Sequence, residues 1–445
     1  MSGNTGAPGP DLRQAFEAPP GRDEAVGLEV EVGLIHSGSR NNASYPQALA
    51  FLVDIVRHFD GEPLLDGANL VGVGLGDGGA FTLETGGALE YSSPPFPTVA
   101  AAVSNAHRRL EMAACVGASH GLVLFTGGIT PFVSAAGIAW NPKPRVRIMR
   151  EYFRGLGRDG AHADEVMGLI LSAQTSLDYT DTDDLMTKLR LLVRASPVVA
   201  ALFVNSPIAA RQQTGALSRR MQYWRCFDPS RCGVLGFALD PGAGVEDLID
   251  WAASLPMIYR VVAGDHVAAP PVSFRHAVER GFGDGTSPTS ADWALHLSQV
   301  WPHVRVRHTL ETRLADAPPW PSFGAGAALW AGLAYDPDAR KTANDLLSGL
   351  SAAEIDRACV DVAVKGLSAM IGPYLVQDVA RELLRLSRNG LHTRVLAGKE
   401  APEALALLDP IDEVCDTMQT FADHALDAWN RGEQHFLSTF SIPVD

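Results

Sequence analysis

Residues 27–35 read Gly-Leu-Glu-Val-Glu-Val-Gly-Leu-Ile, and this stretch decides the fold. Apolar residues occupy every second position from 28 to 34, and Glu29 and Glu31 lie between them. Because side chains of a β-strand alternate between the two faces of a sheet, both glutamates point away from the apolar side. Two carboxylates this close repel each other unless a positive charge lies near them. The stretch therefore predicts a strand whose second face is either solvated or binds a cation.

Acidic residues recur on two further stretches with strand-like patterns. Glu84 and Glu90 flank a double glycine in residues 81–91, and Glu311 lies in the largely alternating residues 304–313. If the glycine segment is extended or forms a three-residue loop, Glu84 and Glu90 share a face, whereas a two-residue hairpin separates them. Carboxylate oxygens are ligands that Mg²⁺ prefers. Five acids on three stretches thus predict a divalent-metal site: Glu29, Glu31, Glu84, Glu90 and Glu311.

Arginines alternate with Glu311 in the third stretch. Arg305, Arg307 and Arg313 occupy odd positions, as Glu311 does, and are predicted to share its face. A solvent-exposed charged strand is one interpretation. The other is a site for phosphate, because planar guanidinium groups suit phosphate and carboxylate oxygens. The chain has neither a GxxxxGK[ST] loop nor a GxGxxG loop in a Rossmann context, which excludes nucleotide sites of those two kinds.

Composition narrows the class of protein. The chain has 445 residues, of which 46% are hydrophobic, and a net charge of −15, which argues against a nucleic-acid partner. No run of about twenty apolar residues predicts a membrane span. Residues 1–24 lack the apolar core of a signal peptide and are predicted to be a disordered tail. Five scattered cysteines without a CxxC pair favour a reducing, cytoplasmic location and free thiols.

The order of patterns predicts an α+β protein with a largely antiparallel sheet rather than a doubly wound fold. Residues 25–445 are expected to form a single domain, with the sheet mainly in 25–340 and a helical C-terminal part in 340–445. Residues 129–165, rich in arginine, are predicted to be irregular. Apolar residues at helical spacing predict helices at 45–58, 98–118, 245–260, 291–300, 323–335 and, densely, 340–431.

Nine segments, in the same order along the chain, resemble the plant and proteobacterial type of glutamate–cysteine ligase, over most of residues 25–395. Each is a weak motif alone, but nine in register are hard to obtain by chance. The segments are residues 27–31 (GLEVE), 83–90 (LETGGALE), 142–150, 174–179 (QTSLDY), 201–207 (ALFVNSP), 217–224, 228–233, 292–297 and 310–316.

This resemblance implies a glutamine-synthetase-like catalytic sheet, curved into a funnel and covered by helices. It implies an ATP-dependent ligase that phosphorylates the γ-carboxylate of L-glutamate and joins it to the amino group of L-cysteine, as in glutathione biosynthesis. Two or three Mg²⁺ ions on the five glutamates are the implied cofactors, and ATP is a co-substrate. The expected partners are small molecules, and the oligomeric state is left open between monomer and homodimer.

The resemblance also implies roles for individual residues. Arg145 and Arg220 are expected to grip the carboxylates of glutamate, and Arg313 to steady the transferring phosphoryl group. The implied catalytic residues are Arg313, Glu311 and Glu84. The implied substrate-binding residues are Arg145, Arg220, Gln174, Ser176 and Trp224. The implied ATP-binding residues are Arg313, Arg307 and Glu31.

Some positions depart from the family pattern. Where relatives read Glu-Pro-Gly-Gly-Gln, this chain has Thr85 and Ala88 in place of the proline and the glutamine. Ser176 replaces an asparagine, and Arg147 replaces an acid. These changes are either neutral or signs of an acceptor other than cysteine, such as a small apolar or non-proteinogenic amino acid. A relative that binds ligands without turnover is the third hypothesis.

Overall fold

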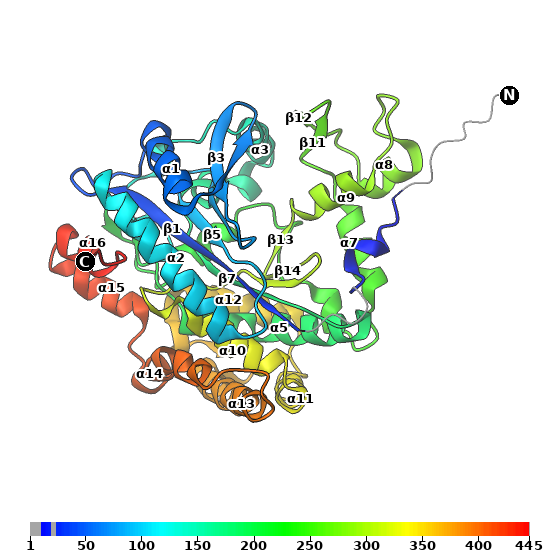
Figure 1. The fold of residues 1–445 in the computed structure, drawn as a ribbon. Coiled ribbons are helices and arrows are strands. Elements are labelled where there is room, and N and C mark those ends of the chain that lie inside the picture. Colours follow the sequence, from blue (N-terminus) through cyan, green and yellow to red (C-terminus); the bar gives the residue numbers. More distant parts are fainter. Residues whose placement is uncertain (1–9, 19–23, 445) are drawn as a thin grey trace.

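The computed structural model describes residues 10–18 and 24–444, and its centre is a nine-stranded sheet (Figure 1). The strand order is β14-β15-β7-β1-β5-β4-β3-β2, with β6 also paired to β1, and all of these neighbours are antiparallel. The predicted α+β class with a mostly antiparallel sheet is confirmed. The strands are β1 (Val26–His36), β2 (Glu62–Asp66), β3 (Asn69–Gly74), β4 (Ala80–Leu83), β5 (Leu89–Ser92), β6 (Leu122–Phe125), β7 (Ala173–Leu177), β14 (Val304–Val306) and β15 (Leu310–Thr312).

Helices precede, interrupt and follow the strands. They are η1 (Arg13–Phe16), α1 (Tyr45–Phe59), α2 (Val99–Ser119), α3 (Pro144–Gly155), α4 (Ala163–Gly168), α5 (Thr182–Leu202), α6 (Arg219–Trp224), α7 (Val245–Ser254), α8 (Phe274–Arg280), α9 (Ser290–Leu297), α10 (Ala325–Ala334), α11 (Pro337–Leu346), α12 (Ala352–Lys365), α13 (Val376–Leu396), α14 (Asp409–Thr417), α15 (Phe421–Asn430) and α16 (Glu433–Thr439). Short pairs add β8 (Ile208–Ala209) with β9 (Gln212–Gln213), β10 (Cys232–Gly233) with β13 (Trp301–Pro302), β11 (Tyr259–Val262) with β12 (Asp265–Ala268), and β16 (Met370–Ile371) with β17 (Tyr374–Leu375).

Helix signals in the sequence explain where most helices begin. Ser44 forms a capping box with Gln47 ahead of α1, and the same arrangement at Ser351 and Glu354 begins α12. The prediction of an irregular stretch at 129–165 was wrong in part, because α3 and α4 lie within it. Most of the arginines of this stretch lie on α3, where Val146, Met149 and neighbouring apolar residues form its buried side.

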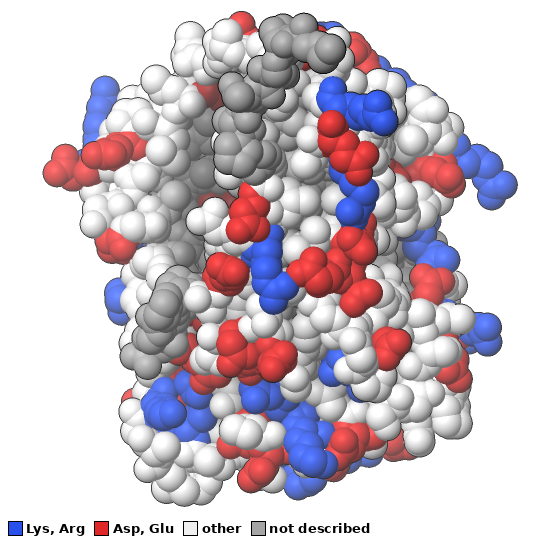
Figure 2. Space-filling model, turned by 90° about the vertical axis from the view of Figure 1, so that its right-hand side faces the viewer, with Lys and Arg blue, Asp and Glu red and all other residues white. Residues whose placement is uncertain are grey.

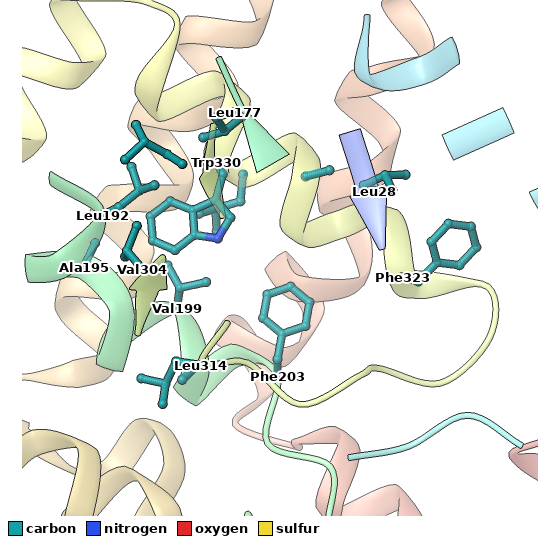
Figure 3. Close-up of a cluster of buried hydrophobic side chains, with 14 of the residues drawn as sticks. Leu28, Leu177, Leu192, Ala195, Val199, Phe203, Val304, Leu314, Phe323 and Trp330 are labelled. Carbon is teal, nitrogen blue, oxygen red and sulfur yellow. The ribbon is translucent and has the colours of Figure 1, made fainter. Parts of the chain in front are cut away.

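The apolar face of the sheet packs against α1, α2, α5 and α10. Figure 3 shows part of this core, where Leu177 and Val304 of the sheet meet Leu192 and Val199 of α5 and Trp330 of α10. Burying each such large side chain contributes about 1.5–3 kcal/mol. The helices therefore hold one face of the sheet in place and leave the opposite, polar face for the site.

The predicted disorder of residues 1–24 is wrong for the described residues 10–18. Phe16 is fully buried and lies edge-on to Trp293, whose indole nitrogen donates a hydrogen bond to the carbonyl of Leu12. Burial of Phe16 anchors residues 10–18, which the average composition of residues 1–24 does not reveal. Residues 1–9 and 19–23 lie outside the described residues.

Candidate active site

Strand pairing aligns the predicted acids on one face of the sheet. Glu31 is the partner of Glu90 across β1 and β5, and Glu29 is the partner of Gln174 across β1 and β7. Glu311 lies opposite Ser176 across β15 and β7. Because paired residues of antiparallel strands project to the same side, these side chains share one face. The structure thus brings together acids that are up to 282 positions apart in the chain, from Glu29 to Glu311.

The β4–β5 connection decides where Glu84 points. The backbone nitrogen of Glu84 donates to the carbonyl of Ala88, which leaves Thr85, Gly86 and Gly87 as a three-residue loop. Gly87 has φ +90°, a conformation that favours glycine. Glu84 therefore shares the face of Glu90, as the three-residue-loop alternative predicted.

Contacts from other segments clamp this loop. A Cβ atom at Gly86 would lie 2.1 Å from the carbonyl oxygen of Gly168, so only glycine fits against α4. Asn141 donates to the carbonyl of Glu84, and the hydroxyl of Thr85 donates to the carbonyl of Met167. Thr85, which replaces the family's proline, thus gains a buried hydrogen bond here. These contacts hold the backbone of Glu84 in place beside the sheet.

Residues 304–313 form a hairpin, β14 and β15, rather than the single strand expected from their alternation. Arg305 lies opposite Glu311, which preserves their shared face. One carboxylate oxygen of Glu311 accepts from Arg305 at 2.8 Å and from Arg307 at 3.2 Å, and the other accepts from Arg313. Burial alone would raise the pKa of Glu311, but the three arginines lower it well below its usual range. Glu311 is therefore an anion already matched by cations.

Gln174 connects this arginine group to the acids of β1. Its amide oxygen accepts from Arg313 at 2.7 Å, and its amide nitrogen donates to Glu31 at 3.3 Å. Ser172 donates to Glu31 at 3.0 Å. Burial, followed by repulsion from Glu84, raises the pKa of Glu31 to about 7. The Gln174 side chain is thus the hydrogen-bonded link between the cationic and the anionic halves of the face.

Nearby arginines offset the charge of the anionic half only in part. Burial raises the pKa of Glu90 well above its usual value, and repulsion from Glu29, Glu84 and Glu31 adds to the effect. Burial and repulsion from Glu311 also raise the pKa of Glu29. Carboxylates in this state are suited to a divalent cation, which would replace protons as the neutralising charge.

The arrangement of donors nevertheless differs from a formed metal site. Among the residues that the structure describes, no group of three or more His, Cys, Asp or Glu side chains is gathered closely enough to hold a metal ion. Carboxylates without a cation between them repel each other. The hard oxygen donors of Glu29, Glu31, Glu84 and Glu90 fit Mg²⁺ chemically. Glu311 does not fit as well, because arginines occupy both of its oxygens.

Two cavities adjoin the polar face. One, of about 100 Å³, is lined by Glu31, Glu84, Ala88 and Arg313, with Met149 and Met167 from α3 and α4 among its apolar walls. The other, of about 430 Å³, lies between α6, α12 and the β10–β13 pair. Trp224, a predicted substrate-binding residue, lines both, as do Trp301 and Arg313.

Arg220 and Arg145, the two arginines expected to bind glutamate, lie on different helices, α6 and α3. Arg220 is fully buried in α6, and its two terminal nitrogens donate to the carbonyls of Leu314 and Arg313, each at 2.8 Å. Its nearest carboxylate is that of Asp316, at 3.8 Å. Arg145 lies half-exposed in the first turn of α3. The predicted grip of Arg220 on glutamate therefore competes with a structural role that the sequence did not indicate.

Replacing Arg220 by Met is expected to lower the free energy of unfolding by about 3–5 kcal/mol, because it leaves a buried carboxylate and two buried carbonyls without their cation. Chemical denaturation measures this. Arg219→Met, on the neighbouring and more exposed position, is the control and should cost less than about 1 kcal/mol. An Arg220→Met protein of unchanged stability but sharply raised glutamate KM would instead restore the substrate-binding role.

Two residues near the acids, Lys143 and Ser172, were not among the site residues predicted from the sequence. Lys143 is buried, donates to the carbonyl of Leu83, and has a pKa lowered by burial, with Glu84 as its strongest opposing charge. Only tertiary burial distinguishes it. Ser172 carried a detectable signal, because it lies two positions before Gln174 and shares its face in an extended segment.

On the face in Figure 2, acidic and basic side chains are interspersed among uncharged ones. Within residues 10–18 and 24–444, no helix combines the length and apolar character that a membrane crossing needs. The described cysteines are free thiols, as predicted.

Comparisons with known proteins agree with the sequence motifs. The model of glutamate-cysteine ligase family 2 matches residues 25–439. The chain is 30% identical over 407 residues to the chloroplastic glutamate–cysteine ligase of Brassica juncea, covering 91% of this chain and 77% of the relative. The chloroplastic enzyme of Arabidopsis thaliana is also 30% identical over 407 residues, covering 91% of this chain and 76% of the relative.

A solved structure shows the same fold. The glutamate–cysteine ligase of Francisella tularensis, in complex with AMP, superposes with a TM-score of 0.57 at 13% identity, over 96% of this chain and 89% of that chain. A bifunctional glutathione synthetase from Pasteurella multocida superposes with a TM-score of 0.54 at 13% identity, over 94% of this chain and 51% of that chain.

The predicted cytoplasmic location is contradicted by the plant relatives, which are chloroplastic enzymes. The prediction relied on scattered free cysteines and the absence of a signal peptide. Those features are compatible with any reducing compartment, so they do not distinguish a plastid from a cytoplasm.

Proposed function

This chain belongs to glutamate-cysteine ligase family 2, and on that basis we propose that it joins the γ-carboxylate of L-glutamate to the amino group of L-cysteine with hydrolysis of ATP to ADP and phosphate. The family predicted from nine sequence segments is confirmed by this membership. The observation that supports the activity most directly is the division of one sheet face into an acidic half and an arginine-rich half, linked by Gln174.

Each half of the polar face has a role in a reaction between two anions. ATP and a carboxylate are both anions, so their approach is unfavourable without cations around them. In the proposal Glu29, Glu31, Glu84 and Glu90 hold Mg²⁺, which when bound neutralises the triphosphate and polarises its terminal phosphoryl group. The ions number two or three, as the resemblance implies.

The arginines act on the phosphoryl group as it transfers. Arg313 lines the acid-lined cavity and is oriented from two sides, by Glu311 and by Gln174. Its fixed guanidinium group stabilises the charge that develops on the phosphate oxygens, without reorganising during the step. Arg307, 39% exposed, remains accessible to the rest of the triphosphate. Glu311 is in this proposal a positioning residue for the three arginines and not a metal ligand.

The amine then completes the reaction. Its nitrogen attacks the γ-acyl phosphate carbon, the bond from that carbon to the phosphate oxygen breaks, and the phosphate leaves with the electron pair and one amine proton. Walls from α3, α4 and α6 restrict the access of water to the acid-lined cavity, which protects the acyl phosphate from hydrolysis.

An assay of the purified full chain tests the activity. With ATP, Mg²⁺, L-glutamate and L-cysteine, we expect ADP, phosphate and γ-glutamylcysteine in equal amounts, measured by phosphate release and mass spectrometry. Omitting glutamate should abolish phosphate release. A chain that binds Mg-ATP in calorimetry but releases no glutamate-dependent phosphate with any amine would contradict the proposal.

A different acceptor is the second candidate, and one feature of the cavity favours it. Ala88 replaces the family's glutamine and lines the acid-lined cavity, so that an amide side chain is absent from this wall. Ser176, between Gly27 and Glu311 on the polar face, is likewise shorter than the asparagine of relatives. Loss of hydrogen-bonding groups near a substrate relaxes discrimination between acceptors.

A further inference from the structure

The larger cavity adjoins the proposed site of activation. It has a volume of about 430 Å³ and shares Trp224, Trp301 and Arg313 with the acid-lined cavity. Arg313 is the same side chain that Glu311 and Gln174 hold in position. A molecule in the larger cavity would therefore lie directly beside the γ-acyl phosphate.

The walls of this cavity are mostly uncharged. Met221, Trp224 and Trp301 contribute apolar surface, together with the thiols of Cys232 and Cys359. Burial raises the pKa of both thiols, which keeps them protonated. Such walls favour an apolar, neutral group over a charged one.

The remaining polar side chains of the cavity are neutral or already paired. Burial lowers the pKa of His303 to about 4, which keeps its ring neutral near pH 7. Arg225 and Asp356 form an ion pair at 3.0 Å, with both side chains about half exposed at the rim. A carboxylate that reaches the rim can share Arg225 with Asp356, because a guanidinium group has five N–H donors.

Buried polar atoms without partners mark the cavity as a binding site. The indole nitrogen of Trp224 and Nδ1 of His303 are buried and make no hydrogen bond with any described residue, and the same is true of Nε of Arg313. An unpaired buried polar group is unfavourable, so native proteins supply a partner for nearly all of them. A ligand with polar atoms near its apolar part would pair with these groups.

The position of the other arginines argues against a nucleotide in this cavity. Arg305 and Arg307 surround Glu311, yet neither is among the residues that line the larger cavity. Of the three arginines around Glu311, a triphosphate placed in this cavity would contact only Arg313. It would not contact Arg307, which is more exposed.

We propose that the larger cavity receives the side chain of the accepting amino acid, and that the acceptor range extends beyond cysteine to amino acids with bulky, uncharged apolar or aromatic side chains. The inference rests on the proposed function, because it concerns the amine of that reaction. A cysteine side chain ends one atom beyond its β-carbon and leaves most of about 430 Å³ unfilled. The product is a γ-glutamyl amide formed by the same displacement of phosphate.

A panel of acceptors tests the inference with the full chain. Cysteine, methionine and phenylalanine are compared by amide formation and phosphate release at saturating glutamate and Mg-ATP. We expect methionine and phenylalanine to be joined with kcat/KM within about tenfold of the cysteine value, or above it. Amide formation with cysteine alone would overturn the inference and leave the proposed function intact. Absence of glutamate-dependent phosphate release with every amine would instead refute the proposed function.

A matched pair of variants locates the acceptor. Ala352 lines the cavity and is half-buried, whereas Ala353, the next residue of α12, is exposed and does not line it. Ala352→Phe should lower the ratio of kcat/KM for phenylalanine to that for cysteine by at least about tenfold, and Ala352→Leu by less. Ala353→Phe should leave the ratio unchanged. Thermal melting of each variant checks the fold.

Two other outcomes would overturn the assignment of the cavity. An unchanged ratio in folded Ala352→Phe and Ala352→Leu proteins would show that the acceptor lies elsewhere. A raised KM for ATP, with the ratio unaffected, would show that the cavity holds the nucleoside instead.

Discussion

Replacing Glu31 by Gln is expected to lower kcat by at least about a hundredfold and, in the absence of metal, to stabilise the folded protein at pH 8. The loss of turnover follows from removing one charged oxygen donor, since metal-ion stabilisation of a phosphoryl transfer contributes several kcal/mol. The gain in stability follows from removing a buried carboxylate that forms no ion pair with any described residue. Glutamate-dependent phosphate release and chemical denaturation in EDTA measure the two effects.

The sign of the stability effect depends on which state binds the proton. The pKa of Glu31 is about 7 in the folded protein, against 4.5 for an unperturbed glutamate. Between pH 4.5 and 7 the unfolded chain has released this proton while the folded protein retains it, so the free energy of unfolding falls as the pH rises through this window. The loss approaches about 3 kcal/mol above pH 7. Gln does not ionise, so Glu31→Gln escapes this loss.

Glu62→Gln is the matched control, because Glu62 is an exposed acid on β2 of the same sheet. It should change neither turnover nor the pH dependence of stability. Retained turnover in Glu31→Gln would remove this residue from the metal site. A wild-type stability that stays constant from pH 5 to 8 would contradict the assignment of a buried, uncompensated carboxylate.

Replacing Arg313 by Gln is expected to lower kcat by about 10²–10³-fold with a smaller change in the KM for glutamate, because the side chain acts mainly on the charge that develops during phosphoryl transfer. Arg305 and Arg307 still neutralise Glu311 in this variant, through bonds at 2.8 and 3.2 Å. The fold should therefore survive, and thermal melting can verify this.

Arg307→Gln provides the comparison within the same cluster. Arg307 contacts Glu311 but is 39% exposed and does not contact Gln174 in the described structure. Its replacement should mainly raise the KM for ATP, by about tenfold or less. If Arg313→Gln and Arg307→Gln reduced kcat equally, the special role of the Gln174-bound arginine would be refuted.

Much of this site followed from local patterns. Alternation along residues 27–35 placed Glu29 and Glu31 on the face opposite the apolar residues, and the structure has them there. The three-residue loop after Glu84 was one of three open alternatives, and a loop shorter by one residue would have reversed the direction of every following side chain. In the three-residue loop, Gly86 packs against Gly168, which lies 82 positions away.

The sequence by itself determined the α+β class, the polar and apolar faces of β1, and the family, because alternation and motif order depend on backbone geometry within a few residues. Only the tertiary structure decided which charges are neighbours. Glu311 is hydrogen-bonded to arginines of its own hairpin. Arg220 donates to a backbone carbonyl, that of Leu314. Glu31 accepts a hydrogen bond from Ser172, 141 positions away. The physical reason is that the pKa and the partners of a charged group depend on burial and on distance in space, and neither can be read from neighbours along the chain.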